Sequence, residues 1–198
     1  MPITTLLLDA DGVVQSNLAL YGRIEALLDG KATFWDASPV EQRGLTGELD
    51  VAVELQRFLD ERDIDLDSRV LLDAWCYTEP DPEAFALVNA VRSHGTPVYL
   101  ATNQQPVRGG WMRATLGYER HFDDLFFSHE LGVAKPDPRF FETILARVGA
   151  DPASTLFVDD HEANVDGARR AGLHAEWHER TSGASDLARI LDGYGVPH

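Results

Sequence analysis

Two aspartates stand two residues apart at the end of a short apolar run near the N-terminus. The stretch is LLLDADGVV, in which Asp9 and Asp11 follow three leucines and Gly12 follows the second aspartate. Alternate residues of a strand point to the same side, so both carboxylates are expected to converge where the chain leaves the sheet, and glycine permits a tight turn there. Like charges a few ångströms apart repel each other unless a cation or a proton intervenes. The pair therefore predicts a bound cation or a shared proton.

Further polar residues follow two other apolar runs or stand in a loop beside them. Singly, such residues are ordinary turn or helix-capping residues. Together they offer carboxylate, hydroxyl, amide and ammonium groups, which can hold a divalent cation and the oxygens of a phosphate. They are Thr102 and Asn103 after PVYLA, Lys135 in GVAKPDP, Asp159 and Asp160 after TLFV, and Asn164 one helical turn further on. Their recurrence at strand ends favours a functional site.

The elements that must position these residues alternate between strands and helices. Apolar runs typical of buried parallel strands cover residues 3–8, 97–101, 155–158 and 173–177. Helical patterns, several of them begun by Asp-Pro or ended by glycine, cover residues 81–95, 106–117, 137–149 and 162–172. This alternation predicts an α/β fold, a Rossmann-like open parallel sheet with helices on both faces.

Residues 16–79 interrupt the alternation. Helical patterns cover residues 17–28, 38–44 and 47–61, and no strand is expected in this stretch. Because the stretch follows the first strand, we expect a small α-helical cap over the carboxyl ends of the strands, where open α/β sheets bind ligands. The predicted domains are an α/β core of residues 1–15 and 80–198 and a cap of residues 16–79.

Four ordered motifs resemble those of the haloacid-dehalogenase-like (HAD) superfamily. They are DADGV at 9–13, ATN at 101–103, KP at 135–136 and FVDDHEANVDGA at 157–168, and the resemblance extends over nearly the whole chain. Within the superfamily, the chain resembles the phosphatase branch with a small helical cap after the first strand. The resemblance implies a hydrolase that acts on a phosphoric monoester.

The resemblance also implies a role for each motif residue. Asp9 is implied as the nucleophile that forms an aspartyl-phosphate, and Asp11 as the acid and base. Thr102 and the Asn103 amide are implied to bind the phosphoryl group, and Lys135 to neutralise it. Dehalogenases of the superfamily lack an acid at the position of Asp11, so its presence favours phosphate esters.

The implied cofactor is Mg²⁺, held by Asp9, by the main-chain carbonyl of Asp11 and by Asp160. Gly12, Asp159 and Asn164 are implied as supporting residues. A carboxylate-rich site without a histidine or thiolate set suits Mg²⁺ better than zinc.

Composition limits the class of partner. The chain has 198 residues, 44% hydrophobic and 25% charged, and a formal net charge of −16, which repels nucleic acid and anionic lipid surfaces. We expect no nucleic-acid or membrane partner, a small phosphorylated metabolite as substrate, and a monomer or homodimer. The N-terminus has no pattern of a signal peptide and Cys76 is a single cysteine, so a cytoplasmic location is expected.

Several residues stay open as secondary candidates. His161, Gln104, Gln105 and Arg108 lie next to motif residues and are candidate substrate contacts. Aromatic residues of the predicted cap, if they face the cleft, can pack on an organic leaving group, and arginines there can help an anionic one. These are Trp35, Trp75 and Tyr77, and Arg23, Arg43 and Arg57.

The predicted function is Mg²⁺-dependent hydrolysis of a small phosphomonoester, with a sugar phosphate as the favoured class. A phosphomutase of the β-phosphoglucomutase type is the nearest alternative, because it uses the same residues and returns the phosphoryl group to the sugar. A non-catalytic phospho-accepting or binding protein is a further alternative. The substrate itself is not readable from the motifs.

Overall fold

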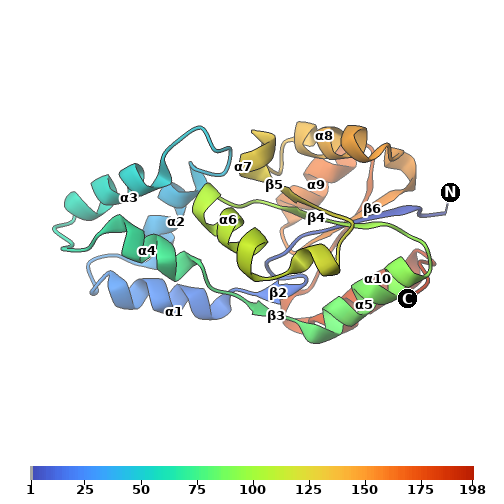
Figure 1. Ribbon diagram of the computed structural model, residues 1–198, viewed down its shortest axis with the longest axis horizontal. Helices are drawn as coiled ribbons and strands as arrows, with labels where there is room; N and C mark the ends of the chain where they lie inside the picture. The colour runs from blue at the N-terminus through green and yellow to red at the C-terminus, as the bar shows by residue number, and fades with distance from the viewer. Residues whose placement is uncertain (1) are drawn as a thin grey trace.

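The computed structural model describes residues 2–198, and a parallel five-stranded sheet forms its centre (Figure 1). The order across the sheet is β5-β4-β1-β6-β7. The strands are β1 (Thr5–Leu8), β4 (Val98–Thr102), β5 (Asp124–Phe127), β6 (Thr155–Asp159) and β7 (His174–Trp177). Every residue of β1 is buried, as expected for a central strand covered on both faces. The predicted open parallel sheet is therefore confirmed.

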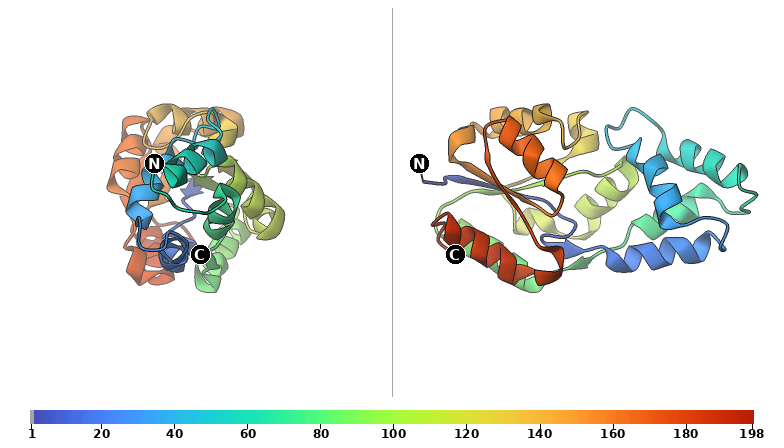
Figure 2. Two further views of the ribbon diagram at one scale, coloured as in Figure 1. Left: turned by 90° about the vertical axis from the view of Figure 1, so that its left-hand side faces the viewer. Right: turned by 180° about the vertical axis from the view of Figure 1, so that it is seen from behind.

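Helices cover both faces of the sheet (Figure 2). Leu6 and Leu8 of β1 pack in one apolar cluster with helices of one face, and Leu7 packs in a second cluster with those of the other. Alternation of side chains along the strand separates the two clusters. The first face carries α5 (Pro82–Ser93), α6 (Pro106–Thr115) and α10 (Ala184–Gly193), and the second carries α7 (Ser128–Leu131), α8 (Pro138–Val148) and α9 (Glu162–Arg170).

The helix boundaries of the α/β part agree with their sequence signals. Asp81 and Asp137 each accept hydrogen bonds from main-chain amides of the first helical turn, ahead of a proline at the start of the helix. Gly149 ends α8 in the left-handed conformation, with a φ of 70°. The four predicted helices of this part are present within a few residues of their expected ends.

The structure contains elements that the sequence reading did not identify. The apolar run of the edge strand β5 is only three residues long, 125–127, and the C-terminal helix α10 lacks a side-chain cap at its start, so both carried weak local signals. Short 3₁₀ turns connect other elements: η1 (Tyr118–Arg120), η2 (Pro152–Ser154) and η3 (Arg180–Ser182).

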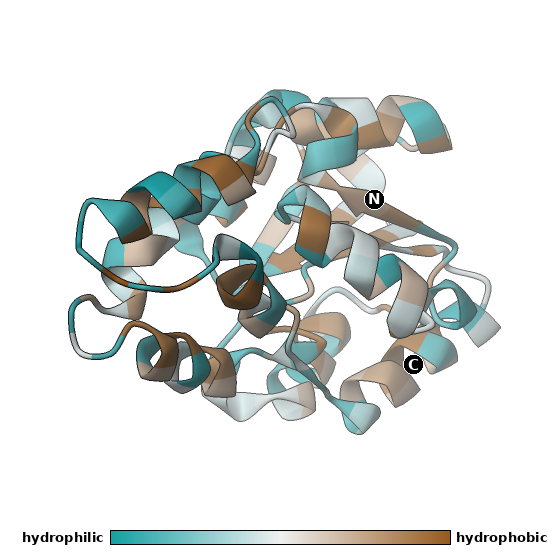
Figure 3. Ribbon diagram, turned by 60° about the vertical axis from the view of Figure 1, so that its left-hand side comes forward, coloured by the Kyte–Doolittle hydropathy of each residue, from teal (hydrophilic) through white to brown (hydrophobic). Residues whose placement is uncertain are grey.

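Part of the chain between β1 and β4 forms a helical insert, which we define as helices α1 to α4. Its helices are α1 (Leu18–Leu27), α2 (Phe34–Gln42), α3 (Val51–Asp60) and α4 (Ser68–Trp75). They enclose an apolar cluster of their own, built around residues such as Ile24, Leu55 and Leu71. Figure 3 shows apolar and polar stretches alternating along these helices, as amphipathic packing requires. The insert lies at the end of the sheet opposite the N-terminus (Figure 1).

Three details of the insert differ from the expectation. The helix α4 (Ser68–Trp75) was not predicted. A two-residue antiparallel ribbon, β2 (Gln15–Ser16) with β3 (Glu79–Pro80), joins the insert to the sheet, although no strand was predicted in residues 16–79. So short a pair has no periodicity to detect. In addition, α2 begins at Phe34 instead of residue 38, because the Thr33 and Asp36 side chains form a capping box there. Pro39 falls within this helix.

No helix among residues 2–198 combines the length and the apolar character needed to cross a bilayer.

Candidate active site

The carboxyl ends of β1, β4 and β6 meet beneath the helical insert and form the floor of a cleft of about 590 Å³. Because neighbouring parallel strands end at the same edge of the sheet, residues far apart in the chain converge there. The floor includes Asp9, Asp11, Thr102, Asn103, Lys135, Asp160 and Asn164. The cleft thus gathers most of the motif residues predicted from the sequence.

Lys135 lies between two carboxylates at the bottom of the cleft. Its Nζ is 2.8 Å from Oδ1 of Asp9 and 2.6 Å from Oδ2 of Asp159. Burial opposes the charge on Lys135, but the two carboxylates outweigh it and raise the pKa of the lysine. Burial raises the pKa of Asp9 to about 6 against the attraction of Lys135. Lys135 is therefore a fixed positive charge beside Asp9.

Asp159 is fully buried and holds this arrangement together. Besides Lys135, it accepts hydrogen bonds from Nδ2 of Asn164, at 3.0 and 3.1 Å, and from the main-chain amide of His161 at 2.8 Å. Asn103 clamps Lys135 from the other side, because its side chain bonds both the amide and the carbonyl of Lys135 at 2.9 Å. These contacts orient the lysine toward Asp9.

Asp11 has a different environment from Asp9. Arg108 donates to both of its carboxylate oxygens, with Nη2 2.8 Å from Oδ1, and Gln15 and Gln104 donate to it at 2.7 and 3.0 Å. Burial would raise the pKa of Asp11, but Arg108 and these hydrogen bonds hold it at about 2. Asp11 is therefore ionised and turned toward α6.

Gly12 allows Asp160 to approach the turn that follows β1. A Cβ on Gly12 would lie 2.3 Å from Oδ2 of Asp160, and the residue has a φ of 85°, so any side chain here would collide with Asp160. Nε of Arg180 donates to the same oxygen of Asp160 at 2.8 Å, and its Nη1 donates to the hydroxyl of Tyr21 on α1 at 3.0 Å. Burial and the nearby Asp9 raise the pKa of Asp160, and Arg180 opposes them.

Three carboxylates of the floor are placed to share a cation. Asp9, Asp159 and Asp160 each present an oxygen, and these oxygens lie within 4.8 Å of one another. Oδ1 of Asp9 is buried and, among residues 2–198, accepts no hydrogen bond of acceptable geometry, although Lys135 is close. An all-oxygen set of converging carboxylates fits a hard divalent cation.

The helical insert supplies the opposite wall of the cleft. Its apolar part consists of Leu20, Tyr21, Phe34, Trp35, Leu45 and Trp75, and its polar part of Asn17, Ser38, Glu41 and Gln42. Trp35 is 68% exposed at the surface, whereas Trp75 is buried. Both tryptophans named as candidates in the sequence analysis line the cleft.

The remaining secondary candidates divide into two groups. Gln104, Arg108 and His161 line the cleft. The side chain of Gln105 instead accepts from the amide of Val107 and caps α6. Arg43 and Arg57 pair with Glu54 on the insert, and Arg23 lies 4.6 Å from the ring centroid of Tyr77. The described cleft is not lined by any of these four residues, Arg23, Arg43, Arg57 and Tyr77.

Sequence reasoning missed several residues that shape the site, notably Arg180, Glu41 and Asn17. They belong to no strand-end motif, and their elements reach the cleft only through tertiary packing. Arg180 lies just beyond β7, which is the neighbour of β6 in the sheet. The predicted strand at residues 173–177 was the one signal in the sequence that could have directed attention to the residues that follow it.

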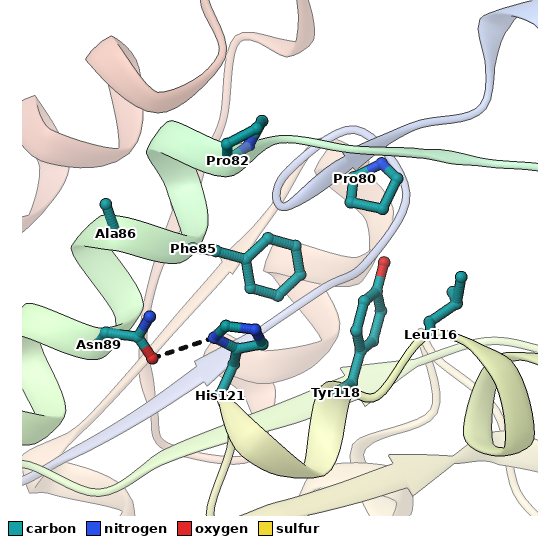
Figure 4. Close-up of a pocket in the computed structure, with 8 residues that line it drawn as sticks. All are labelled: Pro80, Pro82, Phe85, Ala86, Asn89, Leu116, Tyr118 and His121. Carbon is teal, nitrogen blue, oxygen red and sulfur yellow. Dashed lines mark hydrogen bonds between the residues drawn. The ribbon is translucent and has the colours of Figure 1, made fainter.

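Gln15 connects Asp11 to a second cavity, of about 360 Å³, between α5 and η1 (Figure 4). The hydroxyl of Tyr118, whose ring forms one wall of that cavity, donates to Oε1 of Gln15. Gln15 is thereby held with its amide nitrogen toward Asp11. On the other side of the cavity His121 contacts the side-chain oxygen of Asn89 at 3.1 Å. Tyr118 thus orients Gln15, and Gln15 in turn donates a hydrogen bond to Asp11.

Comparison with known families and curated proteins finds similarity to haloacid dehalogenase-like hydrolases and to phosphatases. A family model described as haloacid dehalogenase-like hydrolase matches residues 3–172. Phosphoserine phosphatase of Thermus thermophilus is 36% identical over 100 residues, which cover 50% of this chain and 40% of the relative. A phosphatase of Mycobacterium tuberculosis is 31% identical over 138 residues, which cover 65% of this chain and 64% of the relative. The chain thus spans less than two thirds of each of these relatives.

Solved structures share the fold. A HAD family enzyme of Bacteroides thetaiotaomicron has a TM-score of 0.74 at 19% identity and covers 91% of this chain and 95% of its own. An L-2-haloacid dehalogenase has a TM-score of 0.75 at 18% identity and covers 98% of this chain and 100% of its own. At these identities the likeness shows the fold alone, and the residues of the site have to indicate the reaction.

Proposed function

We propose that this chain, which belongs to the haloacid dehalogenase-like hydrolases, is a Mg²⁺-dependent phosphatase of small phosphomonoesters. One observation carries the proposal: the buried carboxylate of Asp9 lies 2.8 Å from Lys135 and beside Asp160 at the floor of a cleft. A nucleophile, a fixed cation and a second carboxylate for a metal are the parts that phosphoryl transfer requires.

Asp9 is proposed as the nucleophile. One carboxylate oxygen attacks phosphorus and forms an aspartyl-phosphate, while the bond from phosphorus to the leaving oxygen breaks and its electron pair stays on that oxygen. Water then attacks the aspartyl-phosphate and releases inorganic phosphate and free Asp9. Lys135 stabilises the charge on the phosphoryl oxygens in both steps. Asn103 and Asp159 keep the lysine in position, through contacts of 2.6 to 2.9 Å.

Thr102 and the main-chain amide of Asn103 are proposed to hold the phosphoryl oxygens. Thr102 ends β4 next to β1 and is 1% exposed, and its hydroxyl faces the cleft within 3.2 Å of Nε2 of Gln104. A hydroxyl and an amide at this depth can orient phosphorus in line with Asp9.

Asp9, Asp160 and the main-chain carbonyl of Asp11 are the proposed ligands of Mg²⁺, with Asp159 and Asn164 in support. The convergence of the carboxylates of Asp9, Asp159 and Asp160 supports this ligand set. When bound, Mg²⁺ neutralises the phosphate and the carboxylates that surround it. A Bacteroides enzyme of this fold, 20% identical, has been crystallised as a complex with magnesium and inorganic phosphate.

Asp11 is proposed as the residue that protonates the leaving oxygen and later takes a proton from the attacking water. With its pKa at about 2, the carboxylate is ionised in the observed arrangement and bonded to Arg108. The acid step therefore requires Asp11 to leave Arg108, to take up a proton from solvent and to turn toward the leaving oxygen, to which it then transfers that proton. The presence of Asp11 supports attack at phosphorus, where a leaving alkoxide needs a proton, over attack at carbon with a halide leaving group.

The helical insert is proposed to act as a cap, residues 16–79, on a core of residues 1–15 and 80–198. Its wall faces the floor across the cleft and supplies aromatic side chains that can pack on the carbon skeleton of a sugar phosphate. We propose this class of metabolite as the substrate.

Hydrolysis of p-nitrophenyl phosphate tests the function. We expect activity that depends on added Mg²⁺ and disappears in the Asp9→Asn variant, whereas the exposed Asp166→Asn control retains it. Activity without metal, or activity in Asp9→Asn, would overturn the proposal. Release of inorganic phosphate from a sugar monophosphate, measured against formation of an isomeric sugar phosphate, distinguishes hydrolysis from mutase activity.

A further inference from the structure

We propose that Glu41 of the helical insert selects leaving groups that carry hydrogen-bond donors, as hydroxyl or ammonium groups, and disfavours leaving groups that carry a carboxylate. The inference rests on the proposed phosphatase function and adds a substrate class and a residue that determines it. The motif residues on the floor of the cleft handle the phosphate, so this choice falls to the opposite wall.

Glu41 is a buried acid without a partner. It lies near the end of α2, is 9% exposed and lines the cleft together with Asp11 and Arg108. Its side chain forms no hydrogen bond or ion pair of accepted geometry with any of residues 2–198. Glu54, on the neighbouring helix α3, shows the contrast, since it pairs with both Arg43 and Arg57. A carboxyl group left alone at this depth is expensive for the fold and calls for a ligand.

Arg108 is buried and lines the cleft together with Glu41, but it forms no hydrogen bond with Glu41. Its Nη atoms donate to Asp11, to Oε1 of Gln104 and weakly to the carbonyl of Tyr77. The Nη atoms of Arg108 are thus committed to Asp11 and Gln104, while its buried Nε has no acceptor among residues 2–198. Burial raises the pKa of Glu41 to about 7 in spite of the charge on Arg108. Above pH 7, where Glu41 is ionised, it lacks a donor, and a ligand in the cleft can supply one.

A second acceptor stands on the same wall. Oδ1 of Asn17, at the start of α1, is buried and, within residues 2–198, receives no hydrogen bond. Asn17 and Glu41 both line the cleft, and a rotation of the buried Asn17 amide would present its oxygen there beside Glu41. A leaving group with donors satisfies both, and a carboxylated one would place a third acceptor against them.

The apolar side chains around these acceptors define the rest of the leaving group. Leu20, Phe34, Trp35 and Trp75 line the wall beside Asn17 and Glu41. These apolar side chains suit the C–H faces of a compact carbon skeleton, and none of them carries a charge that would attract a carboxylate. The wall therefore fits a polyhydroxylated or amino-substituted alcohol attached to phosphate.

The test compares four phosphomonoesters in the intact protein with Mg²⁺. They are glycerol phosphate with hydroxyl donors, phosphoethanolamine with an ammonium donor, phosphoglycolate with a carboxylate, and p-nitrophenyl phosphate without a donor. For the wild type we expect kcat/KM to be higher for at least one of the donor-bearing esters than for phosphoglycolate. The variants are Glu41→Leu, which removes all hydrogen bonding, and Glu41→Gln, which removes only the charge.

Expected results separate the two donor classes. Glu41→Leu lowers the ratio of kcat/KM for donor-bearing esters to that for p-nitrophenyl phosphate at least tenfold. A similar fall in Glu41→Gln assigns an ammonium group, and a much smaller fall assigns hydroxyl groups. Both variants raise the relative kcat/KM for phosphoglycolate, whereas the exposed Glu48→Gln control on the insert changes no ratio.

Equal changes on all four esters in a folded variant, or no change in any ratio, overturn the inference. So does a wild type that prefers phosphoglycolate. Failure of the proposed function gives a different result, because the wild type then hydrolyses none of the four esters, including p-nitrophenyl phosphate, with Mg²⁺.

Discussion

Arg108 forms a bidentate ion pair with the carboxylate of Asp11, although the two residues are 97 positions apart in the chain. The same floor holds Asp9 beside Lys135, so two aspartates separated by one residue have opposite environments. Burial raises the pKa of Asp9 to about 6, whereas Arg108 overcomes burial and holds the pKa of Asp11 at about 2. Divergent environments of two neighbouring acids are typical of sites in which each has its own role.

Replacing Asp11 separates those roles. We expect Asp11→Asn to lower kcat on an alkyl phosphate by a factor on the order of 10² to 10⁴, because an alkoxide needs a proton to leave. p-Nitrophenolate leaves without one, so with p-nitrophenyl phosphate the first step stays fast and the attack by water becomes slow. Rapid-mixing measurements should then show a burst of p-nitrophenol close to the enzyme concentration. Equal losses on both substrates without a burst would contradict the assignment.

Mg²⁺ should stabilise the protein through Asp160. A ligand at a hundred times its Kd adds about 2.7 kcal/mol to the free energy of unfolding. For a protein of this size that corresponds to a rise in Tm of roughly 5 to 10 °C. Differential scanning fluorimetry with Mg²⁺ and with a chelator checks this. Asp160→Asn should lose most of the rise and Asp166→Asn should keep it, so an equal rise in both variants would argue against the ligand set.

A methyl group at Gly12 should disrupt the same ligand. The Cβ in Gly12→Ala would lie 2.3 Å from Oδ2 of Asp160 and 2.9 Å from Nε of Arg180, at a φ of 85°. We expect the free energy of unfolding to fall by about 1 to 3 kcal/mol and the Mg²⁺-induced rise in Tm to disappear. Gly110→Ala is the matched control, because no heavy atom lies within 4 Å of its Cβ on α6. Retention of the Mg²⁺ effect in Gly12→Ala would show that Asp160 has room to move.

Glu41 should make stability depend on pH. Burial raises its pKa from 4.5 to about 7, so the folded state binds the proton more tightly than the unfolded state between these values. The resulting loss of stability is absent below pH 4.5, grows as the pH rises and is complete above pH 7. We expect Glu41→Gln to be more stable than the wild type by roughly 3 kcal/mol at pH 8 and nearly equal to it at pH 4.5.

Urea denaturation at both pH values measures this difference, with Glu48→Gln as the control. A difference that does not change with pH would contradict the assigned environment of Glu41. A stabilising substitution at a cleft residue would also fit a group retained for function at a cost to the fold.

Local patterns were sufficient for the sheet and for its chemical residues. Apolar runs marked β1, β4, β6 and β7, and parallel strands end at a common edge, so Asp9, Thr102 and Asp160 were expected to meet. Capping residues such as Asp137 marked the starts of helices in the same way. The ribbon β2-β3 was not predicted because two residues carry no detectable period, and β5 was not predicted because its apolar run is only three residues long.

The sequence by itself determined which residues could do the chemistry and at which edge of the sheet, because strand ends and helix caps are written in short stretches of chain. Only the tertiary structure decided what surrounds each of them. The partner of Asp11 comes from α6, that of Asp160 from the segment after β7, and the unpaired Glu41 from the insert. Burial and charge are properties of the whole packed molecule, and they determine which of two similar aspartates has the higher pKa and which acid still lacks a partner.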